Sequence, residues 1–237
     1  MAGGSHIFGD RFMTIALCLL VWNEAHGCQV ELPKIDFSSF DQIFAIDGGS
    51  TDGTIEILEN VGIEVCRQRR SSYNAAYIEA LEFFDTDSVV LYHPKGTIDP
   101  SSLSVMAELL SEGNDLVIAS RMMPGAVNEE DDQIIRHRKW FGEGLALASS
   151  LRWNRNKVQR ITDPLHGYRG CSRNFADSLT LRPSGVTADL EMVQHAYETS
   201  AKVAEFPIQE TVRSEGSTHF PAYKTGKQLI KFLIRSS

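Results

Sequence analysis

The chain has few cysteines, and their spacing matches neither a zinc site nor a disulfide framework. Four occur among 237 residues, at Cys18, Cys28, Cys66 and Cys171, and no two of them form a C-x-x-C pair. Disulfide-stabilised domains are typically much shorter and richer in cysteine. We therefore expect reduced thiols and a cytoplasmic location.

The sequence also lacks a long hydrophobic run and an excess of basic residues. A bilayer-spanning helix needs about 20 apolar residues, and the apolar run at residues 14–22 is far shorter. The formal net charge is −8, so long-range attraction to nucleic acid or to an anionic membrane is unfavourable for the chain as a whole. A transmembrane anchor and general nucleic-acid binding are therefore not expected, although local basic clusters can still bind phosphate.

The first residues carry no recognisable targeting signal. Residues 1–12 are rich in glycine and lack the basic and apolar regions of a signal peptide. We interpret them as a flexible leader or a cloning remnant and leave them out of the fold.

Short apolar runs alternate with helical patterns over residues 13–121. Strands are expected at residues 15–21, 43–46, 63–66, 88–92 and 115–119. Helices are expected between them at residues 54–60, 73–84 and 101–111. This order is typical of βαβ units in a mainly parallel sheet, and the length suits one α/β domain, with or without an appended lobe.

The pattern changes in the second half of the chain. A Pro-Gly pair and the acidic run at residues 128–132 predict a mobile, solvated loop. Further elements are then expected in the order helix 136–153, strand 167–172, helix 190–199 and strand 202–208, followed by an amphipathic segment at 224–234. We interpret this half as a lobe appended to the same domain.

Residues 43–58 are the most informative local pattern. An apolar run ends in Asp47, and Gly48 and Gly49 permit a close backbone approach before a helix-start signal at residues 50–52. In open α/β sheets ligands bind at the carboxyl ends of the strands, where an acid can accept hydrogen bonds from a base or a ribose hydroxyl. The segment predicts a nucleotide-binding turn, and a polar loop without a ligand is the alternative.

Other nucleotide-binding classes lack their motifs in this chain. No G-x-G-x-x-G follows the first expected strand, and no G-x-x-x-x-G-K-[ST] occurs. Sugar nucleotidyltransferases have a Gly-rich first loop with Arg and Lys, which residues 21–24 do not match.

Five segments in order resemble the successive blocks of the family 2 inverting glycosyltransferases, with the closest likeness to dolichyl- or polyprenyl-phosphate sugar transferases. They are residues 20–24, 46–54, 115–121, 163–170 and 205–217. The resemblance covers roughly residues 13–220. It implies a single A-type glycosyltransferase domain of the α/β class, with a Rossmann-like, mainly parallel central sheet flanked by helices. Residues 13–121 would bind the nucleotide sugar, residues 122–223 would bind the acceptor, and residues 224–237 would form an amphipathic tail.

The resemblance also assigns residues to the nucleotide site. Trp22, Asn23 and Glu24 would lie beside the nucleotide, and Asp47 would contact its base or ribose. The turn would be completed by three further residues, namely Gly49, Ser50 and Asp52. A strand end followed by a capped helix is the alternative. Family members often have a second acid where this chain has Gly48.

The chain departs from the family at the end of the fourth expected strand. Where members usually carry Asp-x-Asp, which binds the Mg²⁺ or Mn²⁺ that bridges the diphosphate, this chain has His93-Pro94-Lys95. A protonated lysine cannot bind that metal, but it can place its own charge against the diphosphate. A metal retained on His93 and a loop that has lost its chemistry are the alternatives. We interpret the nearby Asp85-Thr86-Asp87 as a solvated turn at the opposite end of the sheet.

Arginines and one aspartate are the candidates for the acceptor site. An acceptor phosphate can be held bidentately by guanidinium groups, and the candidates are Arg121, Arg138, Arg169 and Arg213. Surface ion pairs are the alternative role for each. A hydroxyl acceptor would need a general base, for which Asp163 is the candidate, with a turn acid before Pro164 as its alternative. Three histidines, His166, His195 and His219, show no ligand pattern.

The leading hypothesis is therefore an inverting glycosyltransferase that moves a sugar from a nucleotide-diphosphate donor to a polyprenyl phosphate or related acceptor, without the usual divalent metal. Lys95 and Asp163 would be its catalytic residues. The alternative is a catalytically impaired relative that binds nucleotide or a partner. We expect peripheral contact with the cytosolic membrane face, where the segment 224–235 either lies on the membrane or packs on its own domain.

Overall fold

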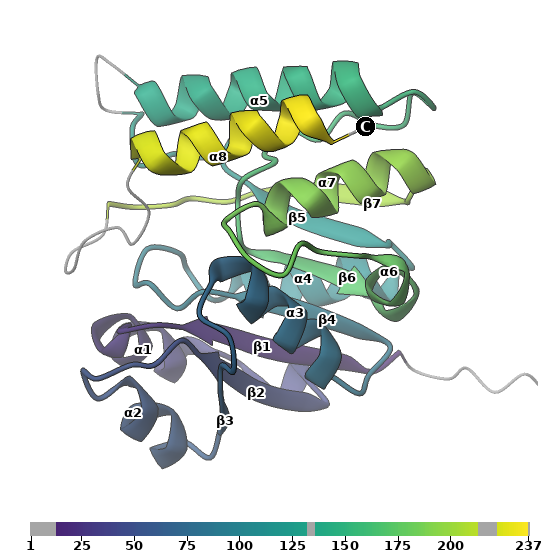
Figure 1. Cartoon of the computed structure of the whole chain (residues 1–237). Helices are drawn as coiled ribbons and strands as arrows, with labels where there is room; N and C mark the ends of the chain where they lie inside the picture. Colours follow the sequence, from purple (N-terminus) through teal and green to yellow (C-terminus); the bar gives the residue numbers. More distant parts are fainter. Residues whose placement is uncertain (1–12, 132–135, 213–221, 237) are drawn as a thin grey trace, which may run out of the picture.

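A sheet of seven strands runs through the protein (Figure 1). The computed structural model describes residues 13–131, 136–212 and 222–236. The strands are β1 (Ile15–Val21), β2 (Gln42–Asp47), β3 (Glu64–Arg67), β4 (Ser88–Tyr92), β5 (Leu116–Ser120), β6 (Arg169–Ser172) and β7 (Val203–Pro207). Their order in the sheet is β3-β2-β1-β4-β6-β5-β7. The predicted α/β class with a mainly parallel sheet is confirmed.

β6 is the antiparallel strand of this sheet. It pairs antiparallel with both β4 and β5, and the other neighbouring pairs are parallel. The first residue of β6 therefore lies at the edge where the parallel strands end, with Arg169 opposite Leu91 and Ile118. This topology brings residues 163–169 to the same edge as Asp47.

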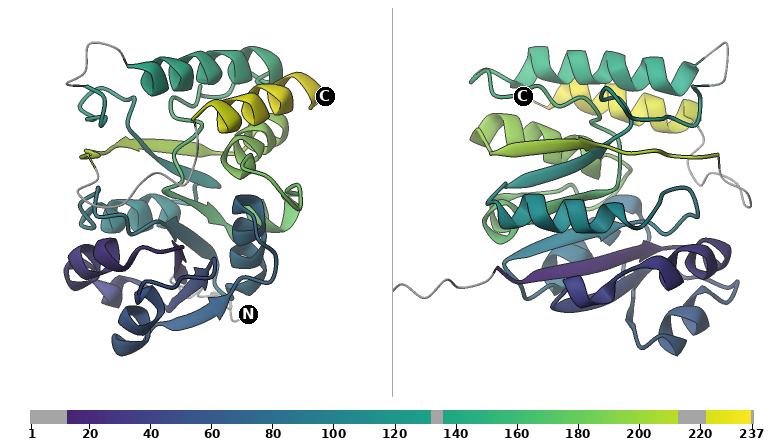
Figure 2. Two further views of the ribbon diagram at one scale, coloured as in Figure 1. Left: turned by 60° about the vertical axis from the view of Figure 1, so that its left-hand side comes forward. Right: turned by 180° about the vertical axis from the view of Figure 1, so that it is seen from behind.

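Helices cover both faces of the sheet (Figure 2). One face carries α1 (Ala25–Glu31), α2 (Thr54–Asn60) and α4 (Ser102–Ser111). The other carries α3 (Tyr73–Phe83), α5 (His137–Trp153), α6 (Arg173–Ser178), α7 (Ala188–Thr199) and α8 (Ala222–Arg235). Short 3₁₀ turns occupy Leu32–Lys34 and Phe37–Ser39.

The central strands are apolar throughout because both of their faces are buried. In β1, Cys18 and Leu20 face the cluster with α3 and α7, whereas Leu17 and Leu19 face the cluster with α1 and α4. All seven residues of β1 are buried. The strand predictions rest on this continuous apolar pattern, and each agrees with the structure to within one or two residues.

Two helices, α1 and α6, were not expected from the sequence. They have seven and six residues, too few for a periodic apolar pattern to stand out, and the equally short α2 was predicted from the Gly-rich start signal before it. α1 begins soon after β1, and it packs under the loop that follows β4. The missed α1 therefore matters for the site.

The acidic run beginning at residue 128 is not a solvated loop, so this prediction is wrong for its described part. Asn128 and Glu130 are buried. The Glu130 carboxylate accepts the backbone N–H groups of Arg138 (2.9 Å) and Lys139 (3.0 Å) at the start of α5. A carboxylate at a helix N-terminus satisfies otherwise unpaired N–H groups and interacts favourably with the helix dipole.

The Asp85-Thr86-Asp87 segment lies at the amino edge of the sheet, as predicted. The Asp87 carboxylate accepts hydrogen bonds from the Thr14 backbone N–H (3.0 Å) and hydroxyl (2.9 Å), next to the first residue of β1. The segment is thus at the opposite edge from Asp47 and takes no part in the candidate site.

α8 packs on its own domain, with Leu229 and Phe232 each 3% exposed. In the described residues, no helix combines the length and the apolar character needed to cross a bilayer.

Candidate functional site

The loops after β1 and β2 are joined into one unit at the carboxyl edge of the sheet. The Asn23 N–H donates to the Ser50 hydroxyl (2.9 Å), and the Thr51 N–H donates to the Asn23 side-chain oxygen (2.8 Å). The Ala25 N–H, at the start of α1, donates to Asp52 (3.0 Å). Asn23 has a φ of +54°, an uncommon conformation for a residue other than glycine. These two motif blocks therefore hold each other in place.

Asp47 shapes the turn that follows β2. Its side chain accepts the backbone N–H groups of Gly49 (2.8 Å) and Ser50 (3.1 Å), and the residue is only 1% exposed. Gly49 has a φ of +97°, which favours glycine. The predicted carboxyl-end position is confirmed, and contact with a base or ribose stays a prediction.

Trp22 is the predicted nucleotide residue with a large exposed side chain. It is 48% exposed, whereas Glu24 is 5% exposed and uses its backbone N–H to bind the Thr54 hydroxyl (2.9 Å). A Cβ added at Gly48 would lie 3.1 Å from the Trp22 Cβ. A side chain at position 48 would therefore crowd Trp22.

His93 turns into the interior. Its ring stacks on Tyr73, with centroids 5.9 Å apart and planes at 13°. The Nε2 atom is buried without a hydrogen-bond partner among the residues that the structure describes, and a Cβ at Gly167 would lie 2.8 Å from it. Burial and the charge of Lys95 lower the pKa of His93 well below its usual value. This packed, neutral ring is a poor match for an open metal ligand.

Lys95 lies among charged groups from the second half of the chain and from the end of β5. Its side chain is half-buried, and its ammonium forms no ion pair within 4.0 Å in the described part of the chain. Burial lowers the pKa of Lys95, and the positive charge of Arg121 lowers it further. The carboxylates of Glu210 and Asp189 act in the opposite direction and raise it. The lysine is therefore a partly desolvated cation with both carboxylates and a guanidinium group nearby.

α1 holds the loop that carries Lys95. A Cβ at Gly27 would lie 2.0 Å from the Pro94 carbonyl oxygen, so the helix and the loop touch through their backbones. Glu31, also on α1, accepts a hydrogen bond from the Tyr92 hydroxyl (2.8 Å) and a longer one from the Ile98 N–H (3.5 Å). Burial raises the pKa of Glu31 to about 7.

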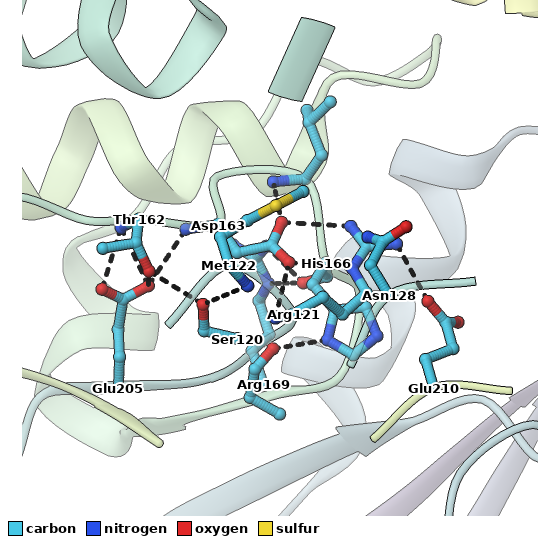
Figure 3. A network of polar contacts seen from close by, with 12 residues as sticks. Ser120, Arg121, Met122, Asn128, Thr162, Asp163, His166, Arg169, Glu205 and Glu210 are labelled. Atoms are coloured by element: carbon cyan, nitrogen blue, oxygen red, sulfur yellow. Dashed lines mark hydrogen bonds and ion pairs between the residues drawn. The ribbon is translucent and has the colours of Figure 1, made fainter. Parts of the chain in front are cut away.

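Arg121 lies between two carboxylates at the end of β5 (Figure 3). Its Nε and Nη2 atoms donate to Asp163 (2.8 and 3.1 Å), and its Nη1 donates to Glu210 (3.1 Å). Asp163 has no exposed surface, and the Arg121 side chain is 19% exposed. Although burial opposes ionisation, the guanidinium holds the pKa of Asp163 well below its usual range.

This placement does not suit the predicted role of Asp163 as a general base. A base needs access to the substrate proton and a pKa near the working pH, whereas both Asp163 oxygens bind Arg121 and its pKa is low. The backbone around it is held by Glu205, which accepts the N–H groups of Thr162 (2.8 Å) and Asp163 (3.1 Å). Asp163 instead orients Arg121.

Arg169 is also placed differently from its predicted role in phosphate binding. The side chain has no exposed surface, and its Nε atom lies 3.2 Å from an oxygen of Asp189. The same carboxylate accepts the hydroxyls of Tyr73 and Tyr77, each at 2.8 Å. Its guanidinium also donates to the backbone carbonyls of His166 and Asp189. A buried arginine paired in this way stabilises packing between β6, α3 and α7, and its lack of exposed surface does not suit acceptor binding.

The remaining predicted residues lie outside this cluster. Arg138 is half-exposed and pairs with Glu129 (2.9 Å), and Arg213 falls outside the described residues. The Nδ1–H group of His166 donates to the Ala119 carbonyl (2.5 Å), and burial lowers its pKa to about 4. His195 hydrogen-bonds Ser178 (2.9 Å), and His219 is not among the described residues.

Sequence reasoning missed four residues of the site, namely Gly27, Glu31, Asp189 and Glu210. Glu210 lies inside a matched block, so its place in that block was the available signal. Asp189 had no local signal, because its partners Tyr73 and Tyr77 are more than 100 residues away along the chain.

The residues present do not fit a divalent metal. Mg²⁺ and Mn²⁺ prefer several carboxylate or carbonyl oxygens. Within residues 13–131, 136–212 and 222–236, no group of three or more His, Cys, Asp or Glu side chains could hold a metal ion. A lysine stands where the family's metal-binding acids are expected, and it adds positive charge to the site.

The fold is that of the A-type glycosyltransferases. Solved structures with this fold include glucosyl-3-phosphoglycerate synthase from Mycobacterium tuberculosis in complex with Mn²⁺ and UDP-glucose. That structure is similar with a TM-score of 0.70 and 19% sequence identity, over 94% of this chain and 78% of the other. A complex of the same enzyme with Mg²⁺ and UDP has a TM-score of 0.67 at 19% identity, over 94% and 78% of the two chains.

The chain belongs to glycosyl transferase family 2, because the model of this family matches residues 35–178. It is also similar to the glycosyltransferase AglJ of Haloferax volcanii, with 30% identity over 211 residues. The match covers 85% of this chain and 65% of AglJ. The chain thus spans slightly less than two thirds of the length of this relative.

Proposed function

We propose that the protein transfers a sugar with inversion from a nucleotide-diphosphate donor to a polyprenyl phosphate or a related anionic acceptor, without a divalent metal. The observation that carries this proposal is Lys95, whose ammonium stands unpaired at the place of the metal-binding acids. Family membership supports the enzymatic reading over a role in binding alone.

In this proposal the donor lies along the carboxyl edge. The base would stack near Trp22, and the Asp47 turn would hold the ribose. The diphosphate would then lie toward Lys95, whose positive charge stabilises the leaving group. A charge that is fixed and partly desolvated stabilises developing negative charge more than the same charge in water.

The chemistry needs no proton transfer when the acceptor is a phosphate. An acceptor oxygen attacks the anomeric carbon from the face opposite the diphosphate, and the bond from that carbon to the diphosphate oxygen breaks. The electron pair leaves with the nucleoside diphosphate, and the configuration inverts. The absence of an accessible base at Asp163 is compatible with this route. Arg121, fixed by Asp163 and Glu210, would face the acceptor.

The first test concerns Lys95. Purified protein is given a panel of nucleotide sugars and a short-chain polyprenyl phosphate, with and without EDTA. We expect transfer to persist in EDTA. Lys95→Ala should lower kcat about 100-fold or more, as for the loss of one charge-stabilising group, whereas Lys34→Ala, at an exposed position, should be neutral. Loss of transfer in EDTA would exclude a metal-free mechanism.

The second test concerns the acceptor. The unphosphorylated polyprenol serves as the matched control, because its hydroxyl needs a base to remove a proton. We expect product from the phosphate alone, detected by mass spectrometry. Nucleotide binding in a calorimeter without transfer to any acceptor would favour the catalytically impaired alternative. A lipid acceptor also requires peripheral contact with the cytosolic membrane face.

A further inference from the structure

Helices α5 and α8 lie side by side along one end of the molecule (Figures 1 and 2). Near their first turns, a Cβ at Gly226 would lie 3.7 Å from the Phe141 ring. Near their last turns, the rings of Trp153 and Phe232 are 5.8 Å apart. The two helices therefore run in the same direction and form one continuous layer.

Each helix presents an apolar stripe on the side away from the core. On α5 the stripe consists of Trp140, Leu147 and Leu151, which are 54%, 48% and 80% exposed. On α8 it consists of Tyr223, Ile230 and Ile234, which are 86%, 46% and 65% exposed. Both sets have the spacing i, i+7, i+11, which places their members on one helix face.

These stripes concentrate apolar surface that is otherwise scattered. Six of the eleven exposed large hydrophobic side chains of the described residues lie on these two helices. The opposite sides of the helices already pack into the core through Leu145 and Leu229. The exposed stripes are therefore additional to the apolar surface that the fold itself uses, and exposed apolar side chains gathered in this way typically mark an interaction site.

Basic side chains flank the stripe on α8. α8 carries four exposed basic residues and no acid; they are Lys224, Lys227, Lys231 and Arg235. None of them forms an ion pair within 4.0 Å inside the described residues. This unneutralised positive charge lies on a chain whose formal net charge is −8. The surface therefore complements a negatively charged partner.

We propose that the α5–α8 face binds the surface of an anionic lipid bilayer. The apolar stripes would enter the boundary between headgroups and acyl chains, and the lysines would contact lipid phosphates. A second copy of the chain is a poorer occupant, because it would bring two positively charged faces together. The start of α5 adjoins the site, since a Cβ at Gly142 would lie 3.3 Å from Met122, next to Arg121.

This surface would deliver a lipid-linked acceptor to Arg121, and in that respect the inference rests on the proposed function. The binding itself is measured without a sugar donor. Failure of vesicle binding and failure of sugar transfer are therefore distinguishable.

The experiment is co-sedimentation of the full chain with vesicles of phosphatidylcholine alone and with vesicles that also contain phosphatidylglycerol. We expect binding to the anionic vesicles, weakened by added salt. The triple variant Lys224→Gln/Lys227→Gln/Lys231→Gln should bind about 100-fold more weakly, as each lysine near such a surface contributes roughly fivefold.

A second variant tests the apolar stripes. Leu151→Ser/Ile234→Ser should weaken vesicle binding about tenfold or more through lost apolar burial. The matched control is Val61→Ser/Val105→Ser, which alters exposed hydrophobic residues elsewhere on the chain and should bind like the parent. Circular dichroism checks that each variant folds.

Three outcomes would overturn the proposal. They are equal binding to neutral and anionic vesicles, binding unchanged by the triple lysine variant, and concentration-dependent dimerisation that Leu151→Ser/Ile234→Ser abolishes while vesicles remain unbound. The last outcome would identify a second copy as the partner.

Discussion

Arg121 and Asp163 form a buried, bidentate ion pair that joins the end of β5 to the loop before β6. Two guanidinium nitrogens donate to the two carboxylate oxygens at 2.8 and 3.1 Å, and the Arg121 backbone N–H adds a third bond at 3.1 Å. Asp163, the candidate base, therefore orients Arg121, the candidate phosphate-binding residue.

Removal of this carboxylate charge should be costly. Asp163→Asn leaves Arg121 with one remaining carboxylate, and we expect the free energy of unfolding to fall by about 3 kcal/mol. Urea denaturation measures the change. The matched control is Asp177→Asn, an exposed acid 3.9 Å from Arg173, for which about 0.5 kcal/mol or less is expected. Equal effects of the two substitutions would contradict the structural role of Asp163.

The close approach of α1 to the Lys95 loop gives a second prediction. In Gly27→Ala the new Cβ would stand 2.0 Å from the Pro94 carbonyl oxygen, so backbone must move. We expect a loss of about 2 kcal/mol in the free energy of unfolding and weaker transfer. Gly144→Ala is the control, because no atom lies within 4 Å of its Cβ; alanine should stabilise that helix by about 0.5 kcal/mol. A stable, active Gly27→Ala variant would show that the loop does not depend on this contact.

Glu31 should make stability depend on pH. Its pKa rises from 4.5 to about 7 through burial, so the folded state binds the proton more strongly than the unfolded state does. The contribution of Glu31 to stability is therefore greatest below about pH 4.5 and falls as the pH rises to about 7. As the pH rises from about 4.5 to 8, the free energy of unfolding of Glu31→Gln should therefore increase by about 3 kcal/mol relative to that of the parent.

Denaturation of both proteins across this pH range measures the difference. Glu59→Gln, at an exposed position on α2, is the control and should follow the parent at each pH. A constant difference between Glu31→Gln and the parent would mean that Glu31 does not titrate in this range.

His166 should act in the opposite direction. Burial lowers its pKa from 6.5 to about 4, so the unfolded state binds the proton more strongly. Its contribution is fully present above about pH 6.5 and is lost as the pH falls to about 4. Between about pH 6.5 and pH 4, the free energy of unfolding should therefore fall by about 3 kcal/mol less in His166→Gln than in the parent. Urea denaturation at a series of pH values measures this difference. The same decrease in stability at low pH in the variant and the parent would contradict a buried, neutral His166.

Most elements of the sheet could be predicted because their patterns are local. β1, α2 and β4 end where the apolar runs and turn residues indicate, and Asp47 lies at its predicted strand end. α1 escaped prediction because it is short and, unlike the equally short α2, does not follow a Gly-rich start signal. The antiparallel direction of β6 could not be predicted, because it depends on which strands lie beside β6, and no local sequence pattern specifies them.

The sequence predicted where the candidate site lies, but it did not predict what each of its residues does. Motif blocks located Arg121, Asp163 and Arg169, yet their roles depend on partners distant along the chain. Arg121 meets Asp163 across 42 residues and Glu210 across 89. Burial of Arg169 against Asp189 likewise follows from the packing of β6 on α7.

The amino-acid sequence alone determined the α/β class, the Asp47 turn after β2 and the His93-Pro94-Lys95 segment at the end of β4, because these depend on residues adjacent in the chain. The tertiary structure alone decided that Asp163 supports Arg121, that α1 holds the Lys95 loop, and that α5 and α8 lie side by side. Those relationships arise from contact and burial between distant segments, which local spacing does not specify.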